Sequence, residues 1–245
     1  MKIGDVYDTT SCGKLTIVQL ESCYKVVVKF LNTGNLRTVD PRNVRKGTVK
    51  DRYAPTIYNI GVVGEKYAIK SDGKVTKEYS TWRNMLARCS NLQYKNFKTY
   101  KDCEVSENFK SYEYFYEWCH KQVGFSLDNF ELDKDLLSKG NKLYSEHTCV
   151  FLPKEINQVL TKSNSNRGDS CIGVSYNKSA NKFRAYFHKN DIAQHLGYYN
   201  TEIEAFNAYK IAKESYLKDL ANKWKDKIDP RAYNALMNYQ VEITD

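Results

Sequence analysis

The chain has 245 residues, of which 41% are hydrophobic and 27% charged, a composition that can bury a core and excludes disorder along its whole length. It contains no apolar run near the ~18–20 residues of a membrane span and no signal-peptide pattern, and its seven cysteines are widely spaced without a CxxC pair. We therefore expect a soluble cytoplasmic protein with neither a disulfide framework nor a cysteine-ligated zinc site.

The net charge of +9 is concentrated toward the two ends of the chain. Residues 1–60 carry 10 basic and 5 acidic side chains, and residues 161–223 carry 10 and 6, whereas residues 61–160 carry 15 and 14. This distribution favours a polyanionic partner that contacts both ends.

Residues 1–60 contain three short β-branched or apolar runs, at 14–20, 24–31 and 36–39. Such runs separated by glycine and proline turns predict a small, basic β-barrel. Residues 61–78 are irregular and rich in glycine, which is typical of a linker. The cations of the barrel loops that we select as candidate DNA contacts are Arg42, Arg45 and Lys46.

Residues 79–162 differ in character and predict a helical module. Apolar residues at helical spacing follow Ser80 and Thr81, either of which is a good N-cap, and a second helix is expected over 111–124. A strand at 129–137, a strand at 148–152 and a helix opened by Pro153 then form a ββα unit.

Residues 171–223 predict three strands followed by a long amphipathic helix capped by Thr201. A polar linker, 163–170, precedes this module, and a tail, 224–245, follows it with a short helix expected from Pro230. Together the elements predict a modular α+β protein. The expected strands are 171–178, 181–189 and 193–199.

The second of these strands carries polar side chains at every other position. Because side chains alternate with a period of two, these residues share one face of the sheet, which we select as a DNA reader. The face consists of Lys182, Arg184, Tyr186 and His188, and its expected neighbours are Tyr176, Lys178 and His195.

Residues 172–217 resemble the plant ethylene-response-factor (Apetala) type of DNA-binding domain, which is also common in phage homing endonucleases. The matching pieces are IGVSY, FRAYF and HLGYYNTEIEAFNAYKIAKESY, in that order. The resemblance implies a three-stranded sheet that enters the major groove of double-stranded DNA, with the helix packed behind it. It also implies a phage gene product in the host cytoplasm.

Residues 79–160 resemble a phage branch of the HNH endonucleases, through YSTWRNMLARC, ENFKSYEYFYEWC, LDKDLLSKGN and YSEHTCVFLPKEIN. The resemblance implies that Asp133 and Asn157 hold a divalent cation such as Mg²⁺. Lys134 occupies the position of the general-base histidine, and Thr148 lies near that of the orienting asparagine. Lysine is normally protonated at neutral pH and then accepts no proton from water, so the centre looks degenerate.

Three hypotheses remain open at this point. The first is a protein that binds double-stranded DNA and is built on a degenerate nuclease. The second is a Mg²⁺-dependent endonuclease or nickase that uses Asp133 and Asn157, with His147 or His120 in place of the missing base. The third is a phage interaction or inhibitor protein whose partner is another protein. No membrane partner is expected.

Overall fold

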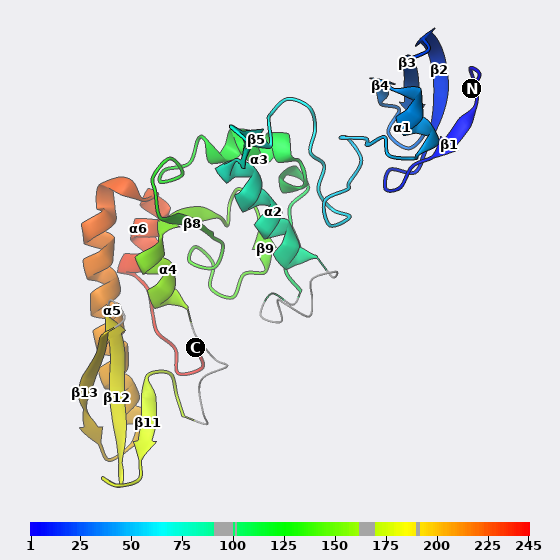
Figure 1. Cartoon of the computed structure of the whole chain (residues 1–245). Coiled ribbons are helices and arrows are strands. Elements are labelled where there is room, and N and C mark those ends of the chain that lie inside the picture. The colour runs from blue at the N-terminus through cyan, green and yellow to red at the C-terminus, as the bar shows by residue number, and fades with distance from the viewer. Residues whose placement is uncertain (91–99, 101, 162–169, 190–191) are drawn as a thin grey trace. The chain divides into compact units, whose positions relative to one another are not determined.

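The computed structural model describes residues 1–90, 100, 102–161, 170–189 and 192–245, and its helices and sheets form an α+β protein (Figure 1). The chain divides into two compact units. Unit 1 comprises residues 1–119 and 142–146, and unit 2 comprises 120–141 and 147–245, so the predicted module 79–162 is divided between them. Of the predicted linker 163–170, only Ser170 lies within the described residues. No helix in the described parts of the chain is both long and apolar enough to cross a membrane.

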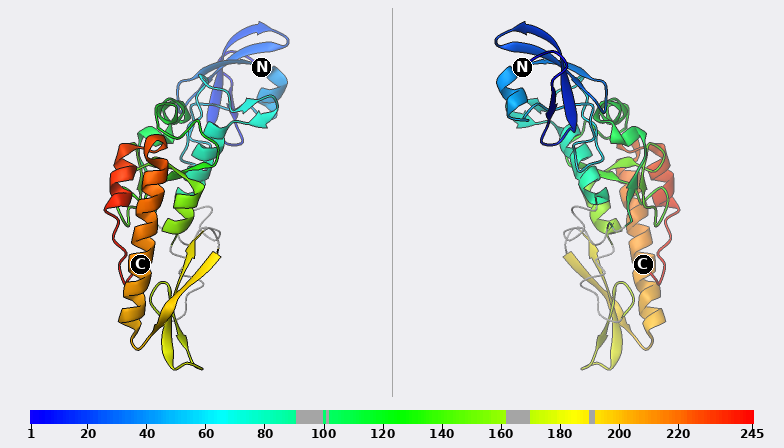
Figure 2. Two further views of the ribbon diagram at one scale, coloured as in Figure 1. Left: turned by 90° about the vertical axis from the view of Figure 1, so that its left-hand side faces the viewer. Right: turned by 90° about the vertical axis from the view of Figure 1, so that its right-hand side faces the viewer.

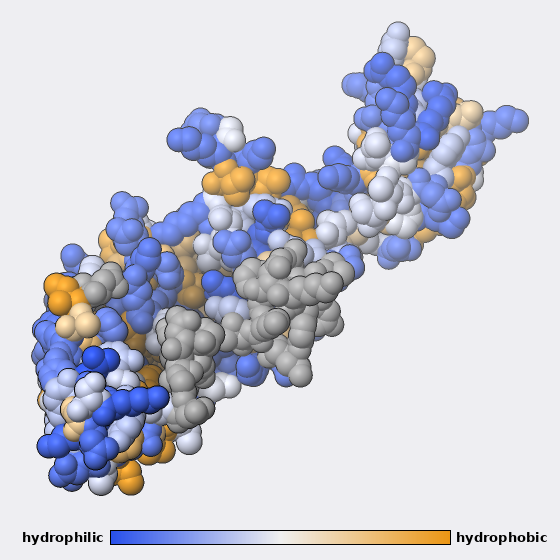
Figure 3. Space-filling view, turned by 60° about the horizontal axis from the view of Figure 1, so that its bottom comes forward, coloured by the Kyte–Doolittle hydropathy of each residue, from blue (hydrophilic) through white to orange (hydrophobic). Residues whose placement is uncertain are grey.

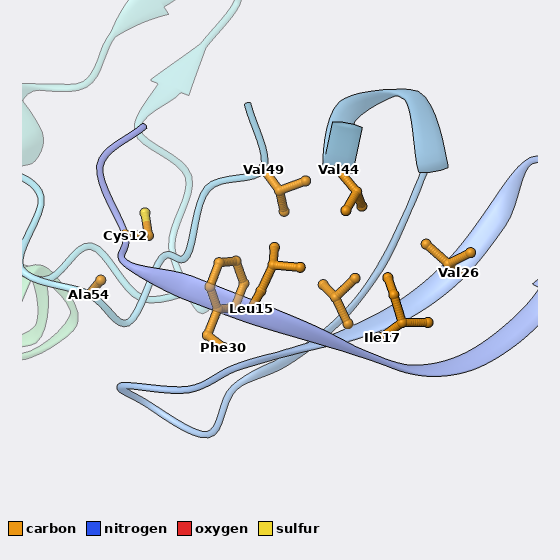
Figure 4. Packing of buried hydrophobic residues seen from close by; sticks show 9 residues of the cluster. Cys12, Leu15, Ile17, Val26, Phe30, Val44, Val49 and Ala54 are labelled. Carbon is orange, nitrogen blue, oxygen red and sulfur yellow. The ribbon is translucent and has the colours of Figure 1, made fainter. Parts of the chain in front are cut away.

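An open antiparallel sheet in the order β1-β2-β3-β4 forms the start of unit 1. The predicted closed barrel is not formed, because β1 and β4 remain the edges of the sheet throughout the fully described residues 1–60. Inward residues of β2 and β3, among them Ile17 and Val26, pack instead against α1 and the segment that follows it (Figure 4). The elements are β1 (Val6–Asp8), β2 (Lys14–Ser22), β3 (Lys25–Phe30), β4 (Leu36–Val39) and α1 (Pro41–Arg45).

Two helices form the rest of the core of unit 1: α2 (Lys77–Cys89) and α3 (Tyr112–Cys119), the latter preceded by the 3₁₀ turn η3 (Asn108–Lys110). Helix α2 begins earlier than expected because the Thr76 hydroxyl, rather than that of Ser80 or Thr81, accepts the first free amide, at 3.3 Å from Tyr79 N. The fully buried Trp82 joins α2 to η3 by donating its Nε1 hydrogen to the Phe109 carbonyl at 2.8 Å.

Residues 61–78, expected to be a linker, make specific contacts with α2, α3 and η3. Val62 exchanges backbone hydrogen bonds with Lys110 and Tyr112, at 2.8 and 2.9 Å. The ring of Tyr67 stacks on that of Tyr116 with 3.8 Å between centroids. The segment therefore belongs to the packing of unit 1. Its hairpin is β5 (Lys70–Ser71) and β6 (Lys74–Val75), and β7 (Glu104–Val105) pairs in parallel with β9 (Leu143–Tyr144).

Unit 2 contains the predicted strand, loop, strand and helix. Strand β8 (Phe130–Asp133) pairs antiparallel with β10 (Val150–Pro153), and α4 (Lys154–Leu160) follows directly. Aromatic contacts support this strand pair, since Phe151 meets Phe125 edge-on at 5.1 Å and Phe130 meets Trp224 at 5.5 Å.

A three-stranded sheet in the order β11-β12-β13 packs on the long helix α5 in the same unit (Figure 2). Thr201 caps α5 as expected, and Glu204 completes a capping box by accepting from the Thr201 amide. The elements are β11 (Val174–Asn177), β12 (Lys182–Lys189), β13 (Ile192–Tyr199) and α5 (Glu202–Trp224), followed by η5 (Lys225–Lys227) and α6 (Pro230–Met237).

Gly173, at the start of β11, permits the close approach of this sheet to α5. Its φ is +73°, and a Cβ atom there would lie 2.1 Å from the Tyr209 ring. Its carbonyl also accepts the Tyr186 amide at 2.9 Å, so the backbone cannot move away without breaking that bond. Gly140 has a similar φ of +78°, but nothing lies within 4 Å of the corresponding Cβ position.

We expect Gly173→Ala to lower the free energy of unfolding of unit 2 by about 3 kcal/mol, since overpacking adds to the left-handed backbone strain. Gly140→Ala, the matched control, carries the strain alone and should cost about 1 kcal/mol. Urea titration combined with hydrogen exchange in α5 measures both. Equal losses of stability in the two variants would contradict this account of the sheet–helix packing.

Candidate nucleic-acid interface

The alternation along β12 separates a buried face from an exposed one. Ala185 and Phe187 are 0% and 5% exposed beneath the sheet, where α5 packs. Arg184 and Tyr186, together with Lys182 and His188, lie on the opposite face, as the period of two predicted. The strand therefore presents Lys182, Arg184, Tyr186 and His188 together, whereas their role in binding stays a prediction.

The strand register determines which residues join them. Arg184 lies between Ser175 on β11 and Tyr198 on β13. A bulge between Ala185 and Tyr186 then shifts the pairing, so that His195 lies opposite Tyr186. A pocket opens here, lined by Arg184, Tyr186, His188, Ala193 and His195.

Aromatic rings support the polar groups of this face. The Arg184 guanidinium carbon lies 5.5 Å from the centre of the Tyr186 ring, and Tyr186 meets His188 edge-on at 5.7 Å. On β13, His195 lies 4.8 Å from Tyr198, whose hydroxyl accepts from Asn177 Nδ2 at 3.3 Å. We call Asn177, Lys182, Arg184, Tyr186, His188, His195 and Tyr198 the exposed sheet face.

The exposed sheet face has cations but no carboxylates. Strands β11, β12 and β13 contain no Asp or Glu. Within the described residues, neither Lys182 nor Arg184 forms an ion pair. The acidic residues of this module that the structure describes lie on α5, behind the sheet. The face therefore presents unneutralised positive charge to solvent.

Tyr176 is not on this face, contrary to the expectation that it neighbours the reader. It lies opposite Phe183 in the register and contacts that ring edge-on at 5.2 Å, on the side that α5 occupies. Asn177 and Tyr198, which sequence reasoning missed, take its place. The alternation of side chains along β11 puts Asn177 on the same face as Lys182, so the sequence could have identified it. On β13 the bulge interrupts the alternation, so the face of Tyr198 could not be read from the sequence. Lys178 is exposed in the turn after β11.

The candidate cations of unit 1 lie on and just after α1 rather than in a loop. Asp40 caps this helix by accepting from Arg42 N at 2.8 Å and also pairs with the Arg42 guanidinium at 2.6 Å. Hydrogen bonds from Arg42 lower the pKa of the Asp40 carboxyl to about 2. Arg45 and Lys46 are exposed and form no ion pair in this fully described part of the chain. In Figure 3, the lobe at the upper right, which contains the N-terminal sheet, shows mainly hydrophilic residues on the visible face.

In the ββα unit, Asp133 ends β8 and caps the turn that follows. Its Oδ1 accepts the amides of Asp135 and Leu136 at 3.0 and 2.8 Å, while Oδ2 accepts no hydrogen bond from the described residues. Burial raises the pKa of Asp133, and the two amides oppose that rise. One oxygen of this carboxylate is thus committed to the turn and the other is not.

Lys134 is a buried clamp on the following loop. It is 5% exposed, and its ammonium donates to Asp135 Oδ1 at 2.5 Å and to the Asn141 carbonyl at 2.7 Å. Asn141 in turn donates to the Lys134 carbonyl at 2.9 Å. These bonds close the loop on itself and give Lys134 a structural task in place of that of a general base.

Asn157, on α4, has one satisfied and one unsatisfied end. Its Nδ2 donates to Glu131 Oε2 at 3.3 Å, whereas its buried Oδ1 has no partner, the one such side-chain atom among the described residues. Glu131 and Asp133 alternate along β8 and so share a face. Thr148 is half-buried in the turn before β10.

The segment after α6 adds a residue that sequence reasoning did not consider. Burial raises the pKa of Tyr239 to about 12, and the carboxylates of Asp245, Asp133 and Asp135 add to the rise. Tyr239 therefore lies near the β8 turn. The proposed substitute bases His120 and His147 are both exposed. Within the described residues, no three His, Cys, Asp or Glu side chains are grouped as metal ligands.

The comparisons identify no relative of the chain. It matches no protein-family model, no curated protein and no solved structure.

We expect Lys134→Met to lower the free energy of unfolding of unit 2 by about 1–3 kcal/mol, because Asp135 and the Asn141 carbonyl lose their donor. Lys121→Met, which removes an exposed lysine of the same unit, should have little effect. Urea titration compares the two. A more stable Lys134→Met protein would mean that desolvation of the ammonium outweighs its bonds, and would contradict the clamp.

Proposed function

We propose that this protein binds double-stranded DNA through the exposed sheet face of unit 2. The observation that supports this most directly is a strand that presents Lys182 and Arg184 beside aromatic and imidazole rings without any carboxylate. Polyanions favour such a surface, and an arginine fork matches guanine O6 and N7 in the major groove.

The arrangement of the sheet is compatible with entry into the groove. The major groove is ~12 Å wide and admits a two-stranded ribbon. Helix α5 packs behind the sheet and leaves the opposite face free for DNA. The resemblance to the ethylene-response-factor type of domain supports the same orientation, with the strands toward the bases.

Within this proposal, the ββα unit contacts the DNA backbone and does not cleave it efficiently. The HNH resemblance puts Lys134 where the base belongs, and this ammonium is buried and bonded to Asp135 and Asn141. Loss of a general base typically slows a reaction by ~10²- to 10⁴-fold.

Arg184→Ala should weaken sequence discrimination, because a bidentate arginine contributes about 1–3 kcal/mol toward its preferred base. Lys218→Ala is the matched control, since it removes one exposed cation from α5. Selection from a random duplex library, followed by gel-shift affinities for the selected and scrambled sites, measures the ratio. Unchanged discrimination in Arg184→Ala would remove this residue from the reader.

A Mg²⁺-dependent endonuclease is the second candidate, and one observation favours it. Asp133 Oδ2 and Asn157 Oδ1 are both acceptor oxygens without a donor in the described structure. Mg²⁺ is held by one or two such oxygens together with water and phosphate, so the chemical type of these two oxygens suits the cation. A bound cation would supply charge stabilisation at the leaving oxygen. Glu131 orients the Asn157 amide through its bond to Nδ2.

Supercoiled plasmid incubated with Mg²⁺ or Mn²⁺ should stay intact if binding alone has been retained. Asp128→Ala is the matched control, since it removes an exposed carboxylate of the same unit. Nicking that persists in Asp128→Ala but disappears in Asp133→Asn would establish the endonuclease instead. Asp133→Asn is the sharper variant because its amide oxygen can still accept the two turn amides. If the protein neither cleaves the plasmid nor gives a salt-sensitive gel shift, the result favours a protein partner.

A further inference from the structure

Two arginines and two tyrosines form a cluster on unit 1, in a region that the proposed function does not use. Tyr79 and Arg83 lie four residues apart on α2 and so share a helix face. The Arg83 guanidinium carbon lies 5.9 Å from the centre of the Tyr58 ring. Burial raises the pKa of Tyr79, and the positive charges of Arg83 and Arg52 oppose this, so Arg52 is within electrostatic range of the Tyr79 hydroxyl. We call Arg52, Tyr58, Tyr79 and Arg83 the arginine–tyrosine cluster.

The donors of this cluster have no acceptors among the residues that the structure describes. In the described structure, neither guanidinium has an ion pair or hydrogen bond, and neither tyrosine hydroxyl has a partner. Asp51 precedes Arg52 but forms no ion pair with it: Asp51 is 1% exposed, and its carboxylate accepts from Thr33, Asn35 and the Tyr53 amide. The cluster thus offers several hydrogen-bond donors and two positive charges.

Hydrogen bonds hold Tyr58 in a strained backbone conformation. Tyr58 and Asn59 have φ of +53° and +59°, in a turn closed by the Ile57 carbonyl, which accepts the amides of Ile60 and Gly61. Glycine and asparagine are the usual residues at such positions, and a tyrosine there is disfavoured. Strain of this kind is concentrated at functional sites. In this protein, the strained turn places the Tyr58 ring against Arg83.

We propose that the arginine–tyrosine cluster binds a phosphate of a nucleic-acid backbone, as a site separate from the exposed sheet face. Arginine forks pair with phosphate oxygens through parallel hydrogen bonds, and tyrosine hydroxyls donate to the same oxygens. The identification of the ligand as DNA rests on the proposed function. The affinity for a phosphate group is inferred from the residues of the cluster alone.

The test uses the full chain with Arg52→Gln and Arg83→Gln combined, and a duplex of random sequence. We expect roughly tenfold weaker binding at fixed salt, and a log–log salt slope smaller by about one unit for each phosphate that the variant no longer neutralises. Lys70→Gln combined with Lys74→Gln is the matched control, since it removes two exposed charges from the neighbouring β5–β6 hairpin. This control should retain both the affinity and the slope.

Tyr58→Gly separates binding from folding. It relieves the strained turn, so unit 1 should be no less stable, yet removal of the ring and hydroxyl should weaken DNA binding by about two- to fivefold. A purely structural Tyr58 would leave affinity unchanged in this variant, and that result would remove it from the site.

The outcomes distinguish this inference from the proposed function. If Arg184→Ala alters DNA binding while the double arginine variant behaves like its lysine control, the cluster does not bind DNA. If wild-type protein binds no duplex, the proposed function fails. Calorimetric titration with inorganic phosphate then tests the cluster. If the wild-type protein binds phosphate and the double variant does not, the cluster is a site for free phosphate, and the nucleic-acid assignment is overturned. If the wild-type protein binds no phosphate, the site itself is overturned.

Discussion

The close approach of the three-stranded sheet to α5 is the constraint on which the rest of unit 2 depends. Gly173 lacks the Cβ atom that would meet Tyr209, and Ala185 is small enough to be fully buried between strand and helix. Once one face of β12 is committed to this packing, the alternation of side chains sends Lys182, Arg184, Tyr186 and His188 to the other. The charge of the exposed sheet face is thus a consequence of packing on the opposite side.

The sequence predicted the parts of the fold that depend on local signals. The period of two on β12, the Thr201 cap and the strand–strand–helix order around Pro153 are all properties of neighbouring residues. Features set by distant contacts were not predictable. Sheet closure depends on whether two edge strands meet, and part of the segment 61–78 looks irregular because Val62 pairs with Lys110 and Tyr112, which lie far along the chain.

The candidate centre shows the same division. Asp133 and Asn157 lie on the predicted strand and helix, but their partners come from positions that no pattern reveals. Lys134 turns toward the Asn141 carbonyl, and Tyr239 approaches Asp133 from beyond α6. The residue type at a motif position therefore indicates which chemical roles a side chain is able to take. The contacts that the side chain makes in its loop determine which of these roles it takes.

The division of the chain between its two units has a consequence for synthesis on the ribosome. Strand β9 supplies the buried Tyr144 to unit 1, yet all of β8, which belongs to unit 2, is translated before it. At ~5–20 residues per second, unit 1 waits about 1–5 s after α3 emerges before its last strand is available. Tyr144 is absent from the core of unit 1 throughout that interval, and the two units cannot be completed strictly one after the other.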